Sequence, residues 1–343
     1  MDRPSTPALV LREQRRLGWR IAFVVTFGFV VAELAAWPVA FIVPLLAVQF
    51  LAALPGAPTG RQIALIVVVT VTTTALSVFA FELLRYRPAA YLTLLFALFA
   101  LAFHLDNFPK TKLVATLLLL SNVFLPILGM QDSAASAGMR DTLVYGSLAA
   151  LLLAWLAHAI FPAQVDPRGA PVNPLAAASP GGEWLRAAIL LLPVGLYLGE
   201  PEGVSFPLVM AALAILRQVE FGMSRRFAMG LLLGNVIGGL AASAAYGVLS
   251  VFPSLATLIL VLLAAGLFFG GRIATAGPQA PVYVMALVVF ITLLGLGLLA
   301  FTSGSAEQFT QRFWGVLLGA IYALSALILF AGRRVAAAQT DRM

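Results

Sequence analysis

The chain has 343 residues, of which 62% are hydrophobic and 10% are charged, and its mean hydropathy is +1.01. A soluble globule of this size needs far more polar surface, so the composition excludes a soluble protein and indicates a membrane protein. The sequence contains no cysteine, which excludes disulfides, thiolate metal sites and cysteine nucleophiles.

Apolar runs of about 17 to 25 residues, the length that crosses a hydrocarbon core of ~30 Å, recur along the whole sequence. Because unpaired backbone groups have no water to bond in lipid, these runs are expected to be helices. We predict twelve of them, at 19–36, 38–54, 62–83, 89–104, 113–129, 142–161, 184–199, 204–217, 226–250, 255–270, 280–301 and 311–331. The predicted fold class is therefore an all-α polytopic membrane protein.

The N-terminal residues 8–20 form a basic amphipathic stretch, in which four arginines recur at helical intervals. Such a stretch is suited to lying along anionic lipid headgroups, so we expect a surface anchor ahead of the first span. Glu33 interrupts the end of the first apolar run and a second run follows at once, which favours an uncleaved span over a signal peptide.

The distribution of basic residues indicates the orientation. With the N-terminus in the cytoplasm, four of the 21 Lys and Arg residues fall outside, namely Arg85, Arg87, Arg140 and Arg312, and the other seventeen fall inside. The positive-inside rule expects this asymmetry, and a missed or additional span would destroy it. Both termini are therefore predicted to be cytoplasmic, and the net charge of +7 reports topology rather than nucleic-acid binding.

A linker is predicted at residues 162–183, which are rich in Pro, Gly, Ala and Ser and lack helical periodicity. It separates a first six-helix repeat, residues 1–161, from a second, residues 184–343. An even number of spans per repeat gives both halves the same orientation, so the repeats are predicted to be parallel.

Matching residues in the two halves support this repeat. Arg20 and Arg61 are 41 positions apart, and Arg186 and Arg226 are 40 apart. The alternative is chance similarity between two hydrophobic stretches.

Arg61 and Arg226 open the third span of each repeat on the predicted cytoplasmic side. A cation there could attract an anion that leaves the cytoplasm, or it could be an ordinary positive-inside anchor. When the repeats are aligned by these arginines, Thr70 faces Asn235. Both third helices then carry a polar residue at mid-membrane depth, where we predict a shared pathway along the repeat axis.

Three later spans carry glycines four residues apart. Such rows are typical of close helix packing, and the alternative is a moving or substrate-lining surface. The rows are Gly230, Gly234 and Gly238; Gly266 and Gly270; and Gly315 and Gly319.

Gln49 and Asn122 are, with Asn235, the neutral polar residues at depth. Each could contact a substrate in the pathway or form a hydrogen bond between helices.

Ionisable residues inside spans cost about 2.5 to 3.5 kcal/mol at a helix centre, so Glu33 and Glu82 are candidates for function. A carboxylate at such a depth could respond to protons from outside, or it could be a snorkelling or salt-bridged residue at the interface. Asp106, close to Lys110 and Lys112, is expected in a solvated loop.

No catalytic constellation is present in the sequence. It lacks the GxxxxGK[ST], HExxH and GxSxG motifs and any pair of carboxylates at metal-ligand spacing. The sequence therefore predicts a protein that is not an enzyme and that has neither a cofactor nor a metal.

The layout of the chain resembles a known family. It consists of six spans, a linker and six more spans, with an Arg opening the third helix of each repeat. The run RRFAMGLLLGNVIGG stands at the second of these arginines. It is similar to the fusaric-acid-resistance-like family of bacterial inner-membrane proteins, in a short form without the large cytoplasmic domains of the longer aromatic-acid exporters. That family in turn resembles the plant aluminium-activated malate transporters, in which two six-span subunits surround an anion pathway.

The resemblance implies export of aromatic or other organic acids across a bacterial inner membrane, with a periplasmic adaptor protein of the membrane-fusion type. On this hypothesis Arg61 and Arg226 gather the anion, Thr70 and Asn235 line the middle, and Glu33 responds to protons. The alternatives are a passive anion channel and a non-transporting membrane scaffold. A membrane-embedded enzyme is disfavoured by the missing catalytic motifs.

Overall fold

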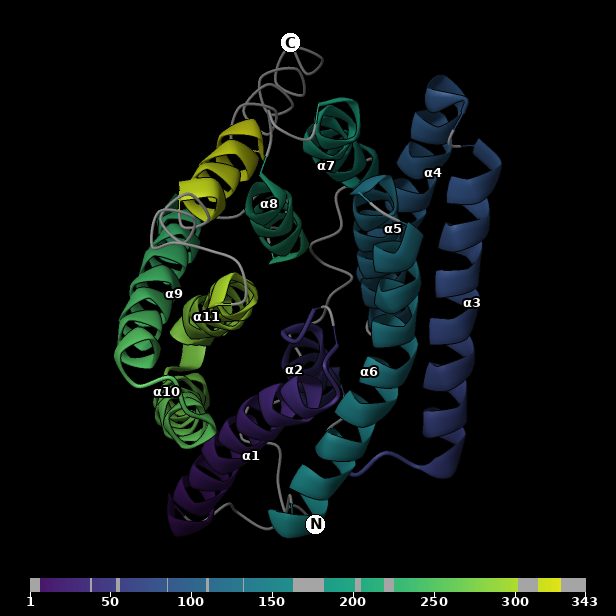
Figure 1. Cartoon of the computed structure of the whole chain (residues 1–343). Coiled ribbons are helices and arrows are strands. Elements are labelled where there is room, and N and C mark those ends of the chain that lie inside the picture. The colour runs from purple at the N-terminus through teal and green to yellow at the C-terminus, as the bar shows by residue number, and fades with distance from the viewer. Residues whose placement is uncertain are drawn as a thin grey trace, which may run out of the picture.

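The computed structural model describes residues 7–37, 39–53, 56–84, 86–108, 111–131, 133–162, 182–200, 205–218, 225–301 and 314–327. Within these ranges the chain forms twelve α-helices and one 3₁₀ turn, and no strand (Figure 1). The predicted all-α class is therefore confirmed for this part of the chain. The predicted linker, 162–183, falls almost entirely outside it.

Each predicted apolar run corresponds to one helix. The first half contains α1 (Pro7–Leu34), α2 (Ile42–Ala53), α3 (Gly60–Leu84), α4 (Pro88–Asp106), α5 (Lys112–Gln131) and α6 (Ser133–Ile160). The second half contains α7 (Gly182–Gly199), α8 (Phe206–Gln218), α9 (Arg225–Val251), α10 (Leu255–Thr275), the turn η2 (Gly277–Gln279), α11 (Ala280–Phe301) and a last, unlabelled helix, Trp314–Leu327.

Eight of the described helices are long and apolar enough to cross a membrane. The shorter apolar helices are Ile42–Ala52, Lys112–Ile127, Phe206–Arg217 and Trp314–Leu327. At 1.5 Å per residue, the 12 residues of α2 extend about 18 Å, less than the ~30 Å hydrocarbon core. The chain is thus a polytopic helical membrane protein, and α2 and α8 are the shortest of the labelled α-helices.

The first helix corrects one expectation from the sequence. Residues 8–20 do not form a separate surface helix, because α1 is continuous for 28 residues from Pro7 to Leu34. Glu13, Leu17 and Arg20 on this basic stretch are buried. One face of the stretch is therefore buried in the protein, whereas Leu11, Arg12, Arg15 and Trp19 on it are exposed.

Local signals fix several helix ends. Pro88 occupies the first turn of α4, where its missing N–H is not needed. The Ser254 hydroxyl accepts a hydrogen bond of 3.1 Å from the backbone N–H of Thr257 and so caps the start of α10. After α1 the chain turns at Ala36, whose φ is +51°.

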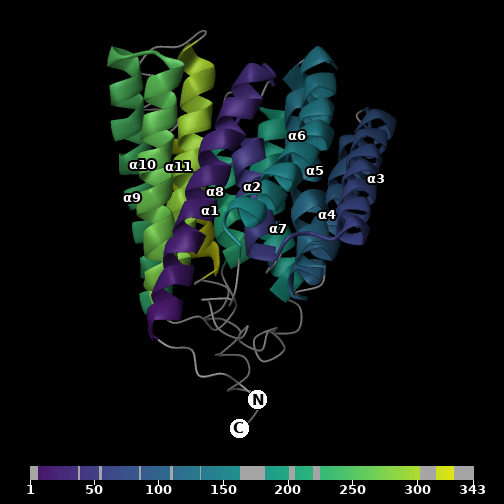
Figure 2. The same ribbon diagram turned by 90° about the horizontal axis from the view of Figure 1, so that it is seen from below.

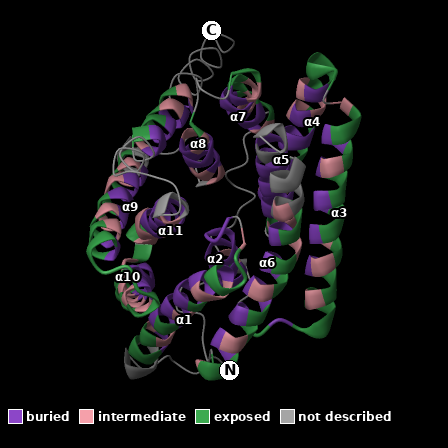
Figure 3. Cartoon of the chain, viewed as in Figure 1, coloured by how far each residue is buried: buried purple, intermediate pink, exposed green. Residues whose placement is uncertain are grey.

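The helices stand side by side as a bundle (Figure 2). The two halves of the chain meet where α1 packs against α10 and where α4 packs against α7. In Figure 1, α2 and α8 lie in the middle of the molecule, and α3 and α9 lie at opposite edges. The side chains buried between helices form one hydrophobic core, whereas large apolar residues on the outer faces are exposed, among them Leu65, Phe79 and Leu233 (Figure 3).

Glycines allow the closest helix contacts. A Cβ atom on Gly266 would lie 2.6 Å from the Cα atom of Ala22, so α10 and α1 approach to backbone contact. A Cβ atom on Gly234 would lie 2.6 Å from the carbonyl oxygen of Val282, which brings α9 equally close to α11. These rows of small residues therefore serve helix packing in this structure.

Candidate functional site

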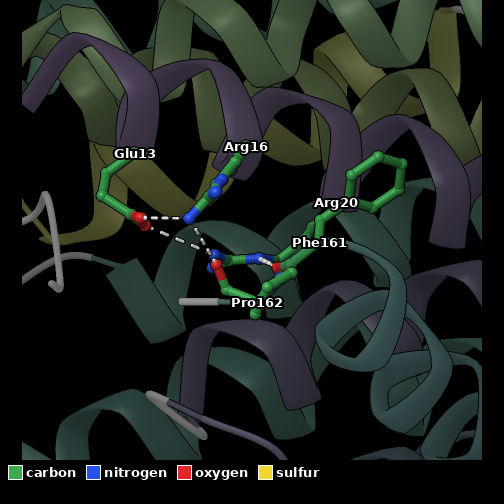
Figure 4. Close-up of polar contacts among 5 residues, drawn as sticks. All are labelled: Glu13, Arg16, Arg20, Phe161 and Pro162. Carbon is green, nitrogen blue, oxygen red and sulfur yellow. Dashed lines mark hydrogen bonds and ion pairs between the residues drawn. The ribbon is translucent and has the colours of Figure 1, made fainter. Parts of the chain in front are cut away.

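A buried polar cluster joins the start of α1 to the end of α6 (Figure 4). Arg20 donates through Nε to the carbonyl oxygen of Phe161 at 2.7 Å, and its Nη2 lies 3.5 Å from Oε2 of Glu13. Arg16 donates through Nη1 to Oε1 of Glu13 at 3.0 Å and to the carbonyl oxygen of Pro162 at 3.1 Å. Glu13 and Arg20 are buried, whereas the Arg16 side chain is 31% exposed.

The cluster has a clear physical cause. The last carbonyls of a helix have no N–H partner within the helix, and a cation near that end is favoured by the helix dipole. Arg16 and Arg20 donate to carbonyls just beyond Ile160, the last residue of α6, and Glu13 pairs with both arginines. The cluster therefore fixes α1 against α6 within the first half.

A second polar cluster connects the two halves. Arg217, near the end of α8, donates through Nη2 to Oγ1 of Thr116 on α5 at 2.6 Å. The same Nη2 lies 3.4 Å from Oδ1 of Asp106, the last residue of α4. Among the ion pairs of the described residues, the Asp106–Arg217 pair joins helices of different halves, whereas the Glu13 pairs stay within α1.

The second cluster was missed by the sequence analysis, and Asp106 corrects one expectation. Instead of a solvated loop residue, Asp106 is a buried residue with 3% of its side chain exposed. The spacing of 111 residues between Asp106 and Arg217 gives no local signal. A polar residue at the predicted cytoplasmic end of an apolar span was the available hint, and the positive-inside rule already accounted for Arg217.

The predicted third-helix residues lie far from each other. Thr70 is buried on α3, which packs against α5 and α6, and Asn235 is buried on α9, which packs against α11. Because α3 and α9 lie at opposite edges of the molecule (Figure 1), the structure does not bring Thr70 and Asn235 together.

Thr70 and Asn235 also have partners within their own helices. The hydroxyl of Thr70 donates to the carbonyl oxygen of Ile66 at 2.8 Å, and the amide nitrogen of Asn235 donates to the carbonyl oxygen of Leu231 at 3.0 Å. The Oδ1 atom of Asn235 is buried and has no hydrogen-bond partner among the described residues.

The two predicted cations are Arg61 and Arg226. Arg61, at the start of α3, is exposed. The helix α9 begins at Arg225, but the side chain of Arg226 lies outside the described residues. Arg61 therefore sits on the surface of an edge helix rather than in the middle of the molecule.

The remaining predicted residues lie on four different helices. Gln49, on the central helix α2, is half-buried. Asn122 on α5 is buried, and its amide nitrogen donates to the carbonyl oxygen of Leu118 at 2.9 Å. Glu33 at the end of α1 and Glu82 near the end of α3 are exposed. The described residues contain no group of three or more His, Cys, Asp or Glu side chains that could hold a metal ion.

Comparison with known families gives one match. Residues 18–157 match a family model described as "Protein of unknown function (DUF2955)". The matched segment runs from α1 to near the end of α6, so it lies within the first half of the chain. No curated protein and no solved structure matches the chain.

Proposed function

We propose that the chain is an efflux transporter of a bacterial inner membrane that exports small organic anions, aromatic carboxylates first among them. Its twelve helices form two parallel six-helix repeats, with both termini in the cytoplasm and the anion route along the seam between the repeats. It works without a cofactor and with a periplasmic membrane-fusion adaptor. This proposal takes up the resemblance to the fusaric-acid-resistance-like family and its aromatic-acid exporters.

The observation that carries the proposal is the correspondence between helix contacts in the two halves. If α1 corresponds to α7 and α4 to α10, then the contact of α1 with α10 is the counterpart of the contact of α7 with α4. Likewise, α3 packs against α5 as α9 packs against α11. Such paired contacts are expected from two parallel repeats related by an axis along the membrane normal, the arrangement of many transporters.

The central pair of helices supports the same proposal. The helices α2 and α8 are the second of each half, both are short, with 12 and 13 residues, and both lie in the middle of the molecule (Figure 1). Transporters often place interrupted or short helices beside the substrate route, because helix ends there can bind polar groups. A route along the seam therefore passes α2, with Gln49, and α8.

The membrane potential supplies the driving force for export. One elementary charge that crosses ~100 mV gains about 2.3 kcal/mol, which corresponds to roughly a fortyfold outward gradient of a monoanion. Export of such an anion from a negative interior thus needs no nucleotide hydrolysis, in agreement with the absence of a GxxxxGK[ST] motif.

The proposal is tested by efflux of labelled benzoate from cells that express the chain. Cells with the protein are expected to lose benzoate faster than cells without it. Arg226→Ala and Glu33→Gln are both expected to slow this efflux, the first by weakening anion capture and the second by removing a proton-responsive group. Unchanged export by both variants would remove these two role assignments.

The alternatives give different results with the purified chain in liposomes. A passive channel carries a current that follows voltage and ignores a pH gradient. A scaffold moves no anion. The glycine contacts of α9 and α10 fit either alternative as well as a transporter, so the flux measurement decides between them.

A further inference from the structure

We propose that Arg217 binds the carboxylate of the exported anion, and that Asp106 is the counter-ion that Arg217 holds in the absence of substrate. This inference rests on the proposed function and deepens it. It moves the anion site from Arg61, on an edge helix, to the junction of α4, α5 and α8.

The hydrogen bonding of Arg217 is incomplete. A guanidinium has five N–H donors arranged as a planar fork, and an Arg–carboxylate pair is strongest when two parallel bonds form. Here the two contacts of Arg217 with other described residues both use Nη2, which donates to Thr116 at 2.6 Å and lies 3.4 Å from one oxygen of Asp106. The Nε atom is buried and has no hydrogen-bond partner among the described residues.

A carboxylate from a substrate would complete this set. It can accept from Nε and Nη2 together, in the two-bond geometry that Asp106 does not reach. An unmade bond to a buried donor costs free energy, so an anion that makes this bond gains relative to water. Thr116 contacts Nη2 of the same guanidinium, so its hydroxyl can help to position the anion.

The location also favours Arg217 over Arg20, an arginine that is buried. Arg20 donates to a helix-end carbonyl and pairs with Glu13, and both contacts stay within the first half. Arg217 instead reaches from α8 of the second half to α4 and α5 of the first. With 13% of its side chain exposed, Arg217 is partly open to an incoming anion, whereas Arg20 is 4% exposed.

Displacement of Asp106 has a mechanical consequence. The Asp106–Arg217 pair links α4 to α8 across the seam. When a substrate carboxylate takes the place of Asp106, this link is lost at the same step as the anion is bound. Substrate binding therefore frees the two halves to separate at this end of the seam.

The test measures binding of benzoate to the purified protein by calorimetry, with neutral benzamide as the ligand control. Wild type is expected to bind benzoate and not benzamide. Arg217→Gln is expected to weaken benzoate binding about tenfold or more, and Arg217→Lys to restore part of it, because Lys keeps the charge without the fork. Asp106→Asn removes the competing carboxylate and is expected to tighten binding by up to about fivefold.

The double variant Asp106→Asn/Arg217→Gln separates binding from structure. It removes both charges and can keep a neutral hydrogen bond, so it is expected to regain thermal stability but not benzoate binding. The exposed Arg272, whose guanidinium lies 5.9 Å from the Phe268 ring, provides the matched control, and Arg272→Gln is expected to bind as wild type does.

Three results would overturn the inference: no benzoate binding by wild type, an unchanged Kd in Arg217→Gln, or full binding by the double variant. The proposed function fails separately. If benzoate binds through Arg217 but the protein moves no anion in liposomes, then the anion site is supported and the transport function is rejected.

Discussion

At the level of single residues, the polar groups of this protein fall into two kinds. Thr70, Asn122 and Asn235 bond to carbonyls of their own helices, which satisfies them at depth without a second helix. Arg20, Asp106 and Arg217 instead make contacts between distant parts of the chain, and Glu13 pairs with Arg20. Only the second kind links polar chemistry to tertiary structure.

The first cluster predicts a strong difference between two arginines of α1. Arg20→Ala removes the buried hydrogen bond to the carbonyl oxygen of Phe161 and the pair with Glu13, so it is expected to lower stability by about 2 kcal/mol or more. Arg16→Ala, at a side chain that is 31% exposed, is expected to cost no more than about 1 kcal/mol. Thermal unfolding of the two variants in detergent measures the difference.

Equal losses of stability in these two variants would contradict the cluster as described. Glu13→Gln provides a further control, because it keeps the shape of Glu13 and a hydrogen-bond acceptor while removing the charge. Its loss of stability is expected to lie between those of the two arginine variants.

At the level of helices, the sequence predicted where the helices lie in the chain better than how long they are. The run predicted at 62–83 is the helix Gly60–Leu84, because an uninterrupted apolar segment in lipid has no alternative to a helix. The run predicted at 142–161 belongs to α6, which begins at Ser133. Small residues such as Ala134 and Ala135 continue a helix without contributing much hydropathy. The predicted run is therefore shorter than α6.

A matched pair of glycines on α10 tests the close contact with α1. A Cβ on Gly266 would meet the Cα of Ala22 at 2.6 Å, whereas a Cβ on Gly271 would meet nothing within 4 Å. Gly266→Ala is expected to destabilise the protein by about 1 to 3 kcal/mol through overpacking. Gly271→Ala is expected to be neutral or to stabilise by up to about 1 kcal/mol, because alanine favours the helix.

Thermal unfolding of both variants provides the measurement. If Gly266→Ala proves as stable as Gly271→Ala, then α1 and α10 do not approach as closely as described.

At the level of the whole molecule, the fold class followed from hydropathy, but the site did not. Composition and helix length decide that the chain is helical and membrane-embedded, whatever the helices contact. The pairing of Asp106 with Arg217 depends on where the end of α8 lies relative to α4 and α5, and no periodicity in the sequence encodes that placement. The third helices illustrate the same limit, since aligned positions such as Thr70 and Asn235 lie on opposite edges.

If the two repeats are parallel, equivalent turns of the two halves lie on the same side of the membrane. The chain has no native cysteine, so single cysteines report accessibility without background. Tyr86→Cys, between α3 and α4, and Phe252→Cys, between α9 and α10, are both at exposed positions and are expected to react with a membrane-impermeant maleimide in intact cells.

The opposite ends of the same helices serve as controls. Phe108→Cys and Thr275→Cys, also at exposed positions, are expected to react only after the membrane is permeabilised. Labelling of Tyr86→Cys and Phe252→Cys from opposite sides would show that the halves are inverted and would exclude parallel repeats.

Anion flux under an imposed potential tests most directly the central claim, that organic anions have a route through this chain. Benzenesulfonate is a suitable probe, because it is a monoanion that does not cross lipid as a neutral acid. In liposomes that contain the purified chain, an interior potential of about −100 mV is expected to drive benzenesulfonate out until the outward gradient approaches fortyfold. Retention of the anion equal to that of protein-free liposomes would contradict the account.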